Sequence, residues 1–308
     1  MDTVPAVAAI DCGTNSTRLL VADGSGRPLA RLMRITRLGQ GVDATGRLAP
    51  EAVERCIAVL QEFRSVMEDV GVSRGRLVAT SAARDAANGA EFLTAAGEVT
   101  GLVPELLSGL EEGRLSMAGA VVDLDPMMEP YLVLDIGGGS TELITARGPD
   151  DPLLEAVSLQ LGCVRLSERF LVDDPPTPEG LARAGAEVTA QLDAAVAAHP
   201  SFLDARRLIG LAGTVTTLAS LQLGMVDYDR DLIHHSSLGS ADVEDWCRRL
   251  SAESAAARLA RPGMVAGRED VIVGGAVILH SVMDRFGFDE CLVSEADILD
   301  GLIASQMG

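Results

Sequence analysis

The sequence predicts an α/β protein built from two similar domains. Strand-like and helix-like segments alternate along the chain, as expected for sheets covered by helices. A short motif around Asp11 recurs around Asp135, 124 residues further on. This spacing is that of a domain rather than of a solenoid repeat, and 308 residues are enough for two domains.

The first part of the chain predicts three strands followed by alternating helices and strands. Pro50 in the first turn and Gly71 beyond the end delimit one long helix. The expected strands are 4–11, 17–23, 29–38, 76–82 and 103–107, and the expected helices are 50–70, 88–100 and 109–120. The resulting order, βββαβαβα, is that of the ribonuclease-H-like unit in the actin-type ATPase architecture.

The second part opens with the same pattern. Its expected strands are 131–136, 142–147, 153–159, 206–214 and 290–297. Its expected helices are an alanine-rich one ending near His199, 214–223, one from an N-cap at Ser240 to about Leu259, 268–287 and 298–305. We predict an N-terminal domain of residues 1–125 and a C-terminal domain of residues 126–308, with the boundary in 121–130. The last helix, about 296–308, is expected to pack back on the first domain.

Composition excludes several function classes. All 25 basic residues are arginines, which excludes a Walker A lysine, Schiff-base chemistry and pyridoxal phosphate enzymes. The net charge of −20 argues against nucleic-acid binding. A polyanionic substrate would need divalent cations and a local group of arginines.

The same composition predicts a cytoplasmic protein. The five cysteines form no CxxC motif and are expected to be reduced, mostly buried thiols. No signal peptide and no membrane-spanning run is evident, so we expect no membrane partner.

The repeated motif predicts two phosphate-binding turns. "DCGTNST" and "DIGGGST" each follow an apolar run. Glycine permits positive φ and close approach of a ligand, and consecutive N–H groups can converge on an anion. The candidate phosphate-binding residues are Gly13, Thr14, Asn15, Ser16, Arg18, Gly137, Gly138, Gly139, Ser140 and Thr141.

The aspartate that opens each turn predicts a metal site. Asp11 and Asp135 are suited to a hard cation, Mg²⁺ or Mn²⁺, and Glu142 completes the set. The alternative is that each aspartate stabilises its own turn in a ligand-free hairpin. Occurrence of the pattern twice favours the ligand-binding interpretation.

Five motifs in order, "AIDCGTNSTRLL", "TSAARDAAN", "SGLEEGR", "LDIGGGSTEL" and "GLAGTVTTLAS", resemble the Ppx/GppA phosphatases. That family comprises exopolyphosphatases and guanosine pentaphosphate phosphatases, and the chain most resembles its short, two-domain actinobacterial exopolyphosphatases. The resemblance implies the fold of the actin, Hsp70 and sugar kinase superfamily, with a cleft between two ribonuclease-H-like domains. The segment "SEADILDG" stands where many members have an arginine-containing motif. The resemblance therefore does not extend to an arginine at this position or to the binding of long chains.

The resemblance also implies roles for single residues. It places the catalytic base at Glu112 rather than Glu111; the alternative is a glutamate that caps a helix. Arg84 would reach the terminal phosphate, or else pair with Asp85 at the surface. Gly213 and Thr214 would bind the substrate chain or cap a helix.

The function implied is metal-dependent hydrolysis of the terminal phosphate of inorganic polyphosphate by an exopolyphosphatase favouring short chains. The alternative substrate is guanosine pentaphosphate, pppGpp, from which the same chemistry would remove the 5′ γ-phosphate. More distant alternatives are a small-molecule kinase and a non-catalytic sensor of polyphosphate or an alarmone. The apolar second part, together with the resemblance, predicts a homodimer.

Overall fold

The computed structural model describes residues 6–121, 124, 130–147, 151 and 154–307. The chain divides into two compact units. Unit 1 comprises Met1–Gly119 and Asp297–Gly308, and unit 2 comprises Ala120–Ala296. The predicted boundary at 125/126 lies outside the described residues, as do the first residues of the strands expected at 4–11 and 153–159.

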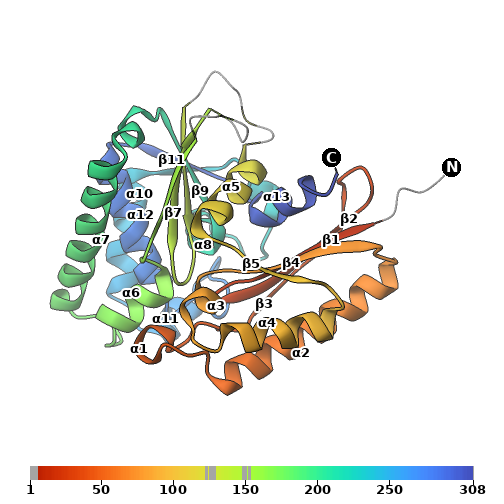
Figure 1. The fold of residues 1–308 in the computed structure, drawn as a ribbon. Helices are drawn as coiled ribbons and strands as arrows, with labels where there is room; N and C mark the ends of the chain where they lie inside the picture. The colour runs from red at the N-terminus through yellow and green to blue at the C-terminus, as the bar shows by residue number, and fades with distance from the viewer. Residues whose placement is uncertain (1–5, 122–123, 125–129, 148–150, 152–153, 308) are drawn as a thin grey trace. The chain divides into compact units, whose positions relative to one another are not determined.

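The described residues of unit 1 form a five-stranded sheet in the order β3-β2-β1-β4-β5 (Figure 1). The three leading strands form an antiparallel meander, and β4 and β5 extend the sheet in parallel from β1. The strands are β1 (Val7–Cys12), β2 (Ser16–Ala22), β3 (Pro28–Ile35), β4 (Arg74–Ala79) and β5 (Pro104–Leu106). This is the ribonuclease-H-like topology that the element order predicts.

Helices cover both faces of this sheet. Alternate residues of β1 point to opposite faces, so Ile10 packs with α2 and α4, whereas Ala9 packs with α13 (Figure 1). The helices are α1 (Val42–Thr45), α2 (Pro50–Val70), α3 (Ser81–Asp85), α4 (Gly89–Thr100), α5 (Gly109–Ala120) and α13 (Ile298–Ala304). The final helix of the chain thus completes the core of unit 1.

The described residues of unit 2 repeat this topology in a six-stranded sheet, β10-β11-β9-β6-β7-β8. Strands β6, β7, β8, β9 and β11 correspond to β1, β2, β3, β4 and β5 of unit 1, and β10 adds an antiparallel edge strand. The strands are β6 (Tyr131–Ile136), β7 (Thr141–Ala146), β8 (Glu155–Leu159), β9 (Arg207–Leu211), β10 (Ser237–Gly239) and β11 (Glu290–Val293).

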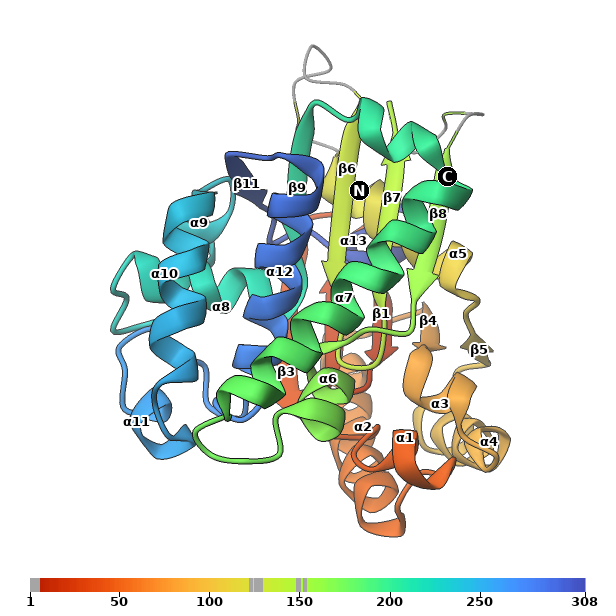
Figure 2. The ribbon, with the colours of Figure 1, turned by 90° about the vertical axis from the view of Figure 1, so that its left-hand side faces the viewer.

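Helices α7 and α12 lie on the sheet of unit 2 (Figure 2). Their apolar side chains belong to the same buried core as those of the strands. Two glycines of α12 allow its close approach to neighbours: a Cβ at Gly274 would lie 2.7 Å from the Cys163 carbonyl oxygen, and one at Gly275 would lie 2.2 Å from Thr214 Oγ1. The helices are α6 (Cys163–Phe170), α7 (Pro178–Ala198), the 3₁₀ helix η2 (Pro200–Asp204), α8 (Ala212–Gln222), α9 (Arg230–Ile233), α10 (Ser240–Ser251), α11 (Ala255–Leu259) and α12 (Ile272–Phe286).

Several sequence-based expectations about the bounds of helices and strands are wrong. The single helix expected from Ser240 to Leu259 is in fact two helices, α10 and α11. The side chain of Ser254 accepts a hydrogen bond from Ala257 N and so caps the start of α11. Ser240 is the first helical residue rather than the N-cap, which is Gly239. The strand expected over 76–82 ends at Ala79, where the chain turns into α3.

The described cysteines are free thiols, as expected. Burial raises the pKa of Cys163 and Cys247 to about 11 and that of Cys291 to about 12, so these thiols are inert at neutral pH. No described helix is both long and apolar enough to cross a membrane.

Candidate active site

The turns after β1 and β6 have the same geometry. Each is closed by one backbone hydrogen bond of 3.0 Å, from Gly13 N to Ser16 O in unit 1 and from Gly137 N to Ser140 O in unit 2. The flanking strands pair in the same register on either side. The sequence repeat is therefore a structural repeat.

The turn glycines are needed for space rather than for positive φ. Neither Gly13 nor Gly137 has a positive φ, contrary to one reason for expecting glycine there. A Cβ at these positions would lie 3.1 Å and 3.0 Å from the carbonyl oxygens of Ser16 and Ser140, the acceptors that close the turns. Such contacts are tighter than nine in ten real Cβ contacts, so a side chain here would require these carbonyl oxygens to shift by a few tenths of an ångström.

The carbonyl groups of the first turn are bound by the segment that follows β3. Thr14 O accepts from Gly39 N at 2.9 Å, and Asn15 O accepts from Thr36 N at 3.1 Å and Arg37 N at 2.9 Å. Among the described residues, the N–H groups of Thr14 and Asn15 donate to no protein acceptor.

The second turn is held in the same way by α6. Val164 N and Arg165 N donate to Gly138 O at 3.0 and 3.1 Å, and Arg165 Nε donates to Gly139 O at 2.7 Å. Within the described chain, the N–H groups of Gly138 and Gly139 make no hydrogen bond to protein. Each turn therefore presents two consecutive amide donors, the arrangement that binds anions.

Gly162 is a site residue that sequence reasoning missed. A Cβ there would lie 2.2 Å from Gly138 O and 2.5 Å from Gly139 N, both backbone atoms of the second turn. Only glycine lets the chain enter α6 so close to the turn. Gly162 lies in the segment "LGCVR", but nothing in that segment indicates that the glycine contacts the second turn.

The remaining turn residues lie mostly inside the fold. Thr14, Ser140 and Thr141 are buried, whereas Asn15 and Ser16 are half-buried. Within the described residues, Thr141 Oγ1 has no hydrogen-bond partner. Its counterpart in the first turn, Thr17, donates to or accepts from Thr36 Oγ1 at 2.9 Å, so this pair of threonines faces the core.

The two strand-end carboxylates have different neighbours. Asp11 faces Arg18 across the hairpin, and Arg18 Nη2 lies 2.6 Å from Asp11 Oδ2. Burial raises the pKa of the Asp11 carboxyl, and the Arg18 charge opposes this shift. Asp135 faces Glu142 instead, and Glu142 Oε1 accepts from Ser158 Oγ at 2.6 Å. One hairpin thus pairs an anion with a cation, and the other sets two carboxylates opposite each other.

Glu111 and Glu112 occupy different environments at the start of α5. Glu111 is exposed, and its Oε2 accepts from Ser108 N at 2.9 Å and Ser108 Oγ at 2.7 Å. Ser108 Oγ in turn accepts from Glu111 N, which makes a capping box. These hydrogen bonds, led by that from the Ser108 backbone, lower the pKa of Glu111. The helix-capping role considered for Glu112 therefore belongs to Glu111.

Glu112 instead pairs with Arg84. Its carboxylate side chain is 12% exposed, and its Oε2 accepts from Arg84 Nη1 at 3.2 Å. The same Arg84 nitrogen donates to Leu107 O at 2.8 Å, which fixes the guanidinium at the start of α5. The structure thus brings together the two residues predicted to act in catalysis.

Gly213 and Thr214 lie in the first turn of α8, which follows β9 directly. The residue with a left-handed conformation is Ala212, with φ of 64°, rather than the glycine. Arg268 Nη1 donates to Gly213 O and to Thr217 Oγ1, both at 2.7 Å. A Cβ at Gly213 would lie 2.5 Å from Arg268 Cζ, so the glycine makes room for this guanidinium, a contact that sequence reasoning did not predict.

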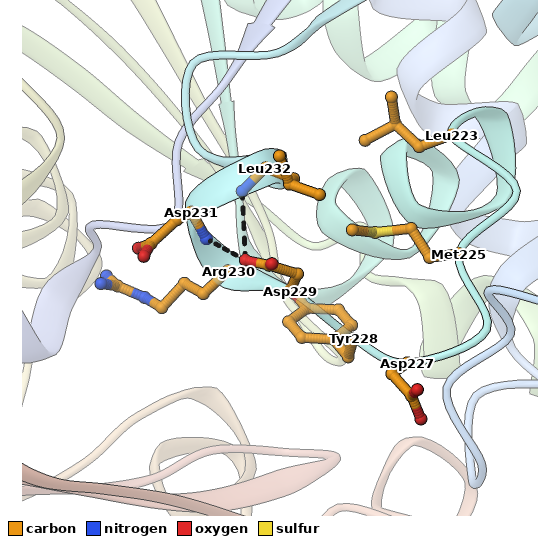
Figure 3. Close-up of a pocket in the computed structure, with 8 residues that line it drawn as sticks. All are labelled: Leu223, Met225, Asp227, Tyr228, Asp229, Arg230, Asp231 and Leu232. Carbon is orange, nitrogen blue, oxygen red and sulfur yellow. Dashed lines mark hydrogen bonds between the residues drawn. The ribbon is translucent and has the colours of Figure 1, made fainter.

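A pocket of about 580 Å³ lies elsewhere in unit 2 (Figure 3). Asp229 accepts from Asp231 N and Leu232 N and so caps α9 beside it. The pocket is lined by Leu223, Met225, Asp227, Tyr228, Asp229, Arg230, Asp231 and Leu232. None of the predicted site residues lines this pocket, which has acidic and apolar walls.

Taken together, a duplicated ribonuclease-H-like unit with two amide-lined turns defines a class of phosphate-binding α/β proteins. The model of the Ppx/GppA phosphatase family matches residues 20–308, and the chain belongs to this family. It is 42% identical over 318 residues to Exopolyphosphatase 2 of Mycobacterium tuberculosis, with 98% of each chain covered.

Solved structures agree with this assignment. The chain superposes on an exopolyphosphatase-like protein with a TM-score of 0.92, at 36% identity and 98% coverage of both chains. It superposes on the Aquifex aeolicus member of the Ppx/GppA family with a TM-score of 0.80, at 31% identity, covering 98% of this chain and 97% of that one.

Proposed function

We propose that this protein is an exopolyphosphatase that hydrolyses the terminal phosphoanhydride of inorganic polyphosphate, with a preference for short chains. The observation that carries the proposal is the pair of equivalent turns, each with bound carbonyls and two amide donors. Each turn suits an anionic group such as a phosphate of the substrate. The family and the similarity to Exopolyphosphatase 2 support the substrate class.

Glu112 is the proposed general base. Its carboxylate, oriented by Arg84, would accept a proton from the water that attacks the terminal phosphorus. Arg84 would also offer its remaining donors to the terminal phosphate. Among the turn residues, the N–H groups of the two hairpins would bind phosphate oxygens, with Ser16 and Ser140 beside them.

We also propose that the site takes Mg²⁺ or Mn²⁺. The donors suit a hard cation, and Asp11 Oδ1 is a buried carboxylate oxygen without a hydrogen-bond partner in the described chain. The proposed carboxylate ligands are Asp11 in unit 1 and Asp135 and Glu142 in unit 2. No group of three or more potential metal ligands occurs among the described residues, and Mg²⁺ is commonly bound through one or two carboxylates together with substrate phosphates. When bound, the cation would neutralise charge on the phosphates.

Removal of metal is expected to abolish phosphate release. Asp135→Asn should lower the rate and weaken Mn²⁺ binding at least about tenfold, measured by electron paramagnetic resonance. Asp193→Asn, which alters an exposed carboxylate paired with Arg285, should change neither. Undiminished hydrolysis in excess chelator would contradict the metal assignment.

Comparison of three substrates tests the proposed function. Phosphate release should be fastest from short polyphosphate, slower from long polyphosphate and slowest from pppGpp. Faster release from pppGpp would favour the alternative, a guanosine pentaphosphate phosphatase. Release from none of the three would leave the kinase and sensor alternatives.

A further inference from the structure

A line of ion pairs connects three strands and the last helix of unit 1. On β2, Arg18 donates Nε and Nη2 to Asp11 Oδ2 at 3.1 and 2.6 Å, and it donates Nη1 to Asp297 at the start of α13. On β3, Arg31 Nη1 lies 3.9 Å from Asp297 Oδ1, and Nη2 lies 2.5 Å from Asp300 Oδ1. Three carboxylates thus share two guanidinium groups, a formal charge of −1.

Arg18 is the central member of this network. Its side chain is 20% exposed, and those of Asp11 and Asp297 are 3% and 10% exposed, so solvent screens these charges weakly. Arg18 also faces Asp11 directly behind the first phosphate-binding turn. Its guanidinium is divided between a carboxylate of the site and a carboxylate 279 residues away in the sequence.

The negative charge of Asp297 is not needed for its other task. Asp297 is the N-cap of α13: its Oδ1 accepts from Leu299 N at 2.9 Å, and its own N–H donates to Asp300 Oδ2 at 2.9 Å. Asparagine caps helices as well as aspartate does. The charge acts on the two arginines that Asp297 contacts and also on Asp11, whose pKa it helps to raise.

We propose that Asp297 is an affinity-determining residue that weakens the binding of the phosphate chain. It engages one arm of Arg18 and adds negative charge beside the first turn. A polyanionic substrate must then compete with Asp297 for the Arg18 guanidinium. Binding that is equally strong in the ground and transition states does not raise turnover, so weaker binding here costs no catalytic rate and favours release of phosphate. This inference rests on the proposed function.

Asp297→Asn tests it, because the substitution keeps the size and the helix cap and removes the charge. In the Glu112→Gln background, in which turnover is suppressed, the Kd for tripolyphosphate by calorimetry should fall on the order of 10-fold. In the otherwise wild-type chain, KM should fall similarly and kcat should stay within about twofold. If Asp297→Asn folds poorly, Asp297→Ser can replace it, because serine also caps helices. It should show the same fall in Kd and KM.

Asp300→Asn is the matched control. The substitution removes one carboxylate from the same network and keeps an acceptor for Asp297 N. Asp300 pairs with Arg31 rather than with Arg18. Its Kd should change by less than about twofold. Adding Arg18→Gln to Asp297→Asn should abolish the gain in affinity.

Three results would overturn the inference. They are a Kd that is unchanged or higher in both Asp297→Asn and Asp297→Ser, an equal gain in affinity in Asp300→Asn, and a gain in affinity that persists when Arg18→Gln is added. Absence of tripolyphosphate binding in every variant would overturn it as well. Binding is measured without turnover, so failure of the wild-type chain to hydrolyse polyphosphate would contradict the proposed function, while the Kd ratios would still decide this inference.

Discussion

Replacement of Glu112 by glutamine is expected to lower the turnover number for short polyphosphate by about 10²- to 10⁴-fold, the usual contribution of a positioned base. Glutamine keeps the size of the side chain and an oxygen that can accept from Arg84, but it cannot take a proton from water. Binding of tripolyphosphate should therefore stay close to that of the wild type. Phosphate release and calorimetry measure the two quantities separately.

Glu111→Gln is the matched control for this variant. It removes the same charge from the adjacent residue and keeps an acceptor for the hydrogen bonds from Ser108. Its kinetics should match those of the wild type. Loss of turnover in Glu111→Gln with normal turnover in Glu112→Gln would move the base by one residue. Normal turnover in both variants would refute the catalytic assignment.

Gly162→Ala is expected to lower kcat/KM for polyphosphate on the order of 10²-fold, the cost of misplacing binding groups by about 1 Å. The new Cβ would lie 2.2 Å from Gly138 O, a backbone atom, so either the turn or α6 must move. The amide donors of Gly138 and Gly139 would then leave their positions, and KM should rise. The measurement is steady-state phosphate release at a temperature well below the unfolding transition.

Gly180→Ala separates this effect from loss of stability. Its Cβ would lie 2.5 Å from Phe170 O, a comparable backbone clash at the other end of α6. Both variants should lose about 1–3 kcal/mol of stability through overpacking. Only Gly162→Ala should raise KM. An equal rise in both would indicate that general destabilisation, and not the second turn, is responsible.

The sequence predicted the fold well where local patterns determine it. The helix expected over 50–70 has those bounds in the structure because Pro50 and Gly71 mark its ends. The duplication predicted equivalent hairpins, and their matching register confirms this. Short helices such as α3 and α6 were missed because five to eight residues are fewer than the window over which periodicity is judged. The break before Ser254 was missed because helix-forming alanines lie on both sides of it.

The site was predictable only in part, because several of its contacts join residues far apart in the chain. Glu112 and Arg84, predicted separately, meet in the structure. By contrast, no local signal pairs Arg18 with Asp297, or Gly162 with the turn at Gly138. Such pairings follow from how strands and helices pack in three dimensions, and sequence patterns do not encode them.

Hydrolysis of tripolyphosphate in H₂¹⁸O, followed by ³¹P nuclear magnetic resonance, tests most directly whether this protein directs water to the terminal phosphorus. The account predicts that each orthophosphate released contains one ¹⁸O from water and that the pyrophosphate left behind contains none. Label in the pyrophosphate, with unlabelled orthophosphate, would mean attack on the inner phosphorus. Absence of label from both products in the first turnover would mean that a group other than water is the nucleophile. Either result would contradict the account.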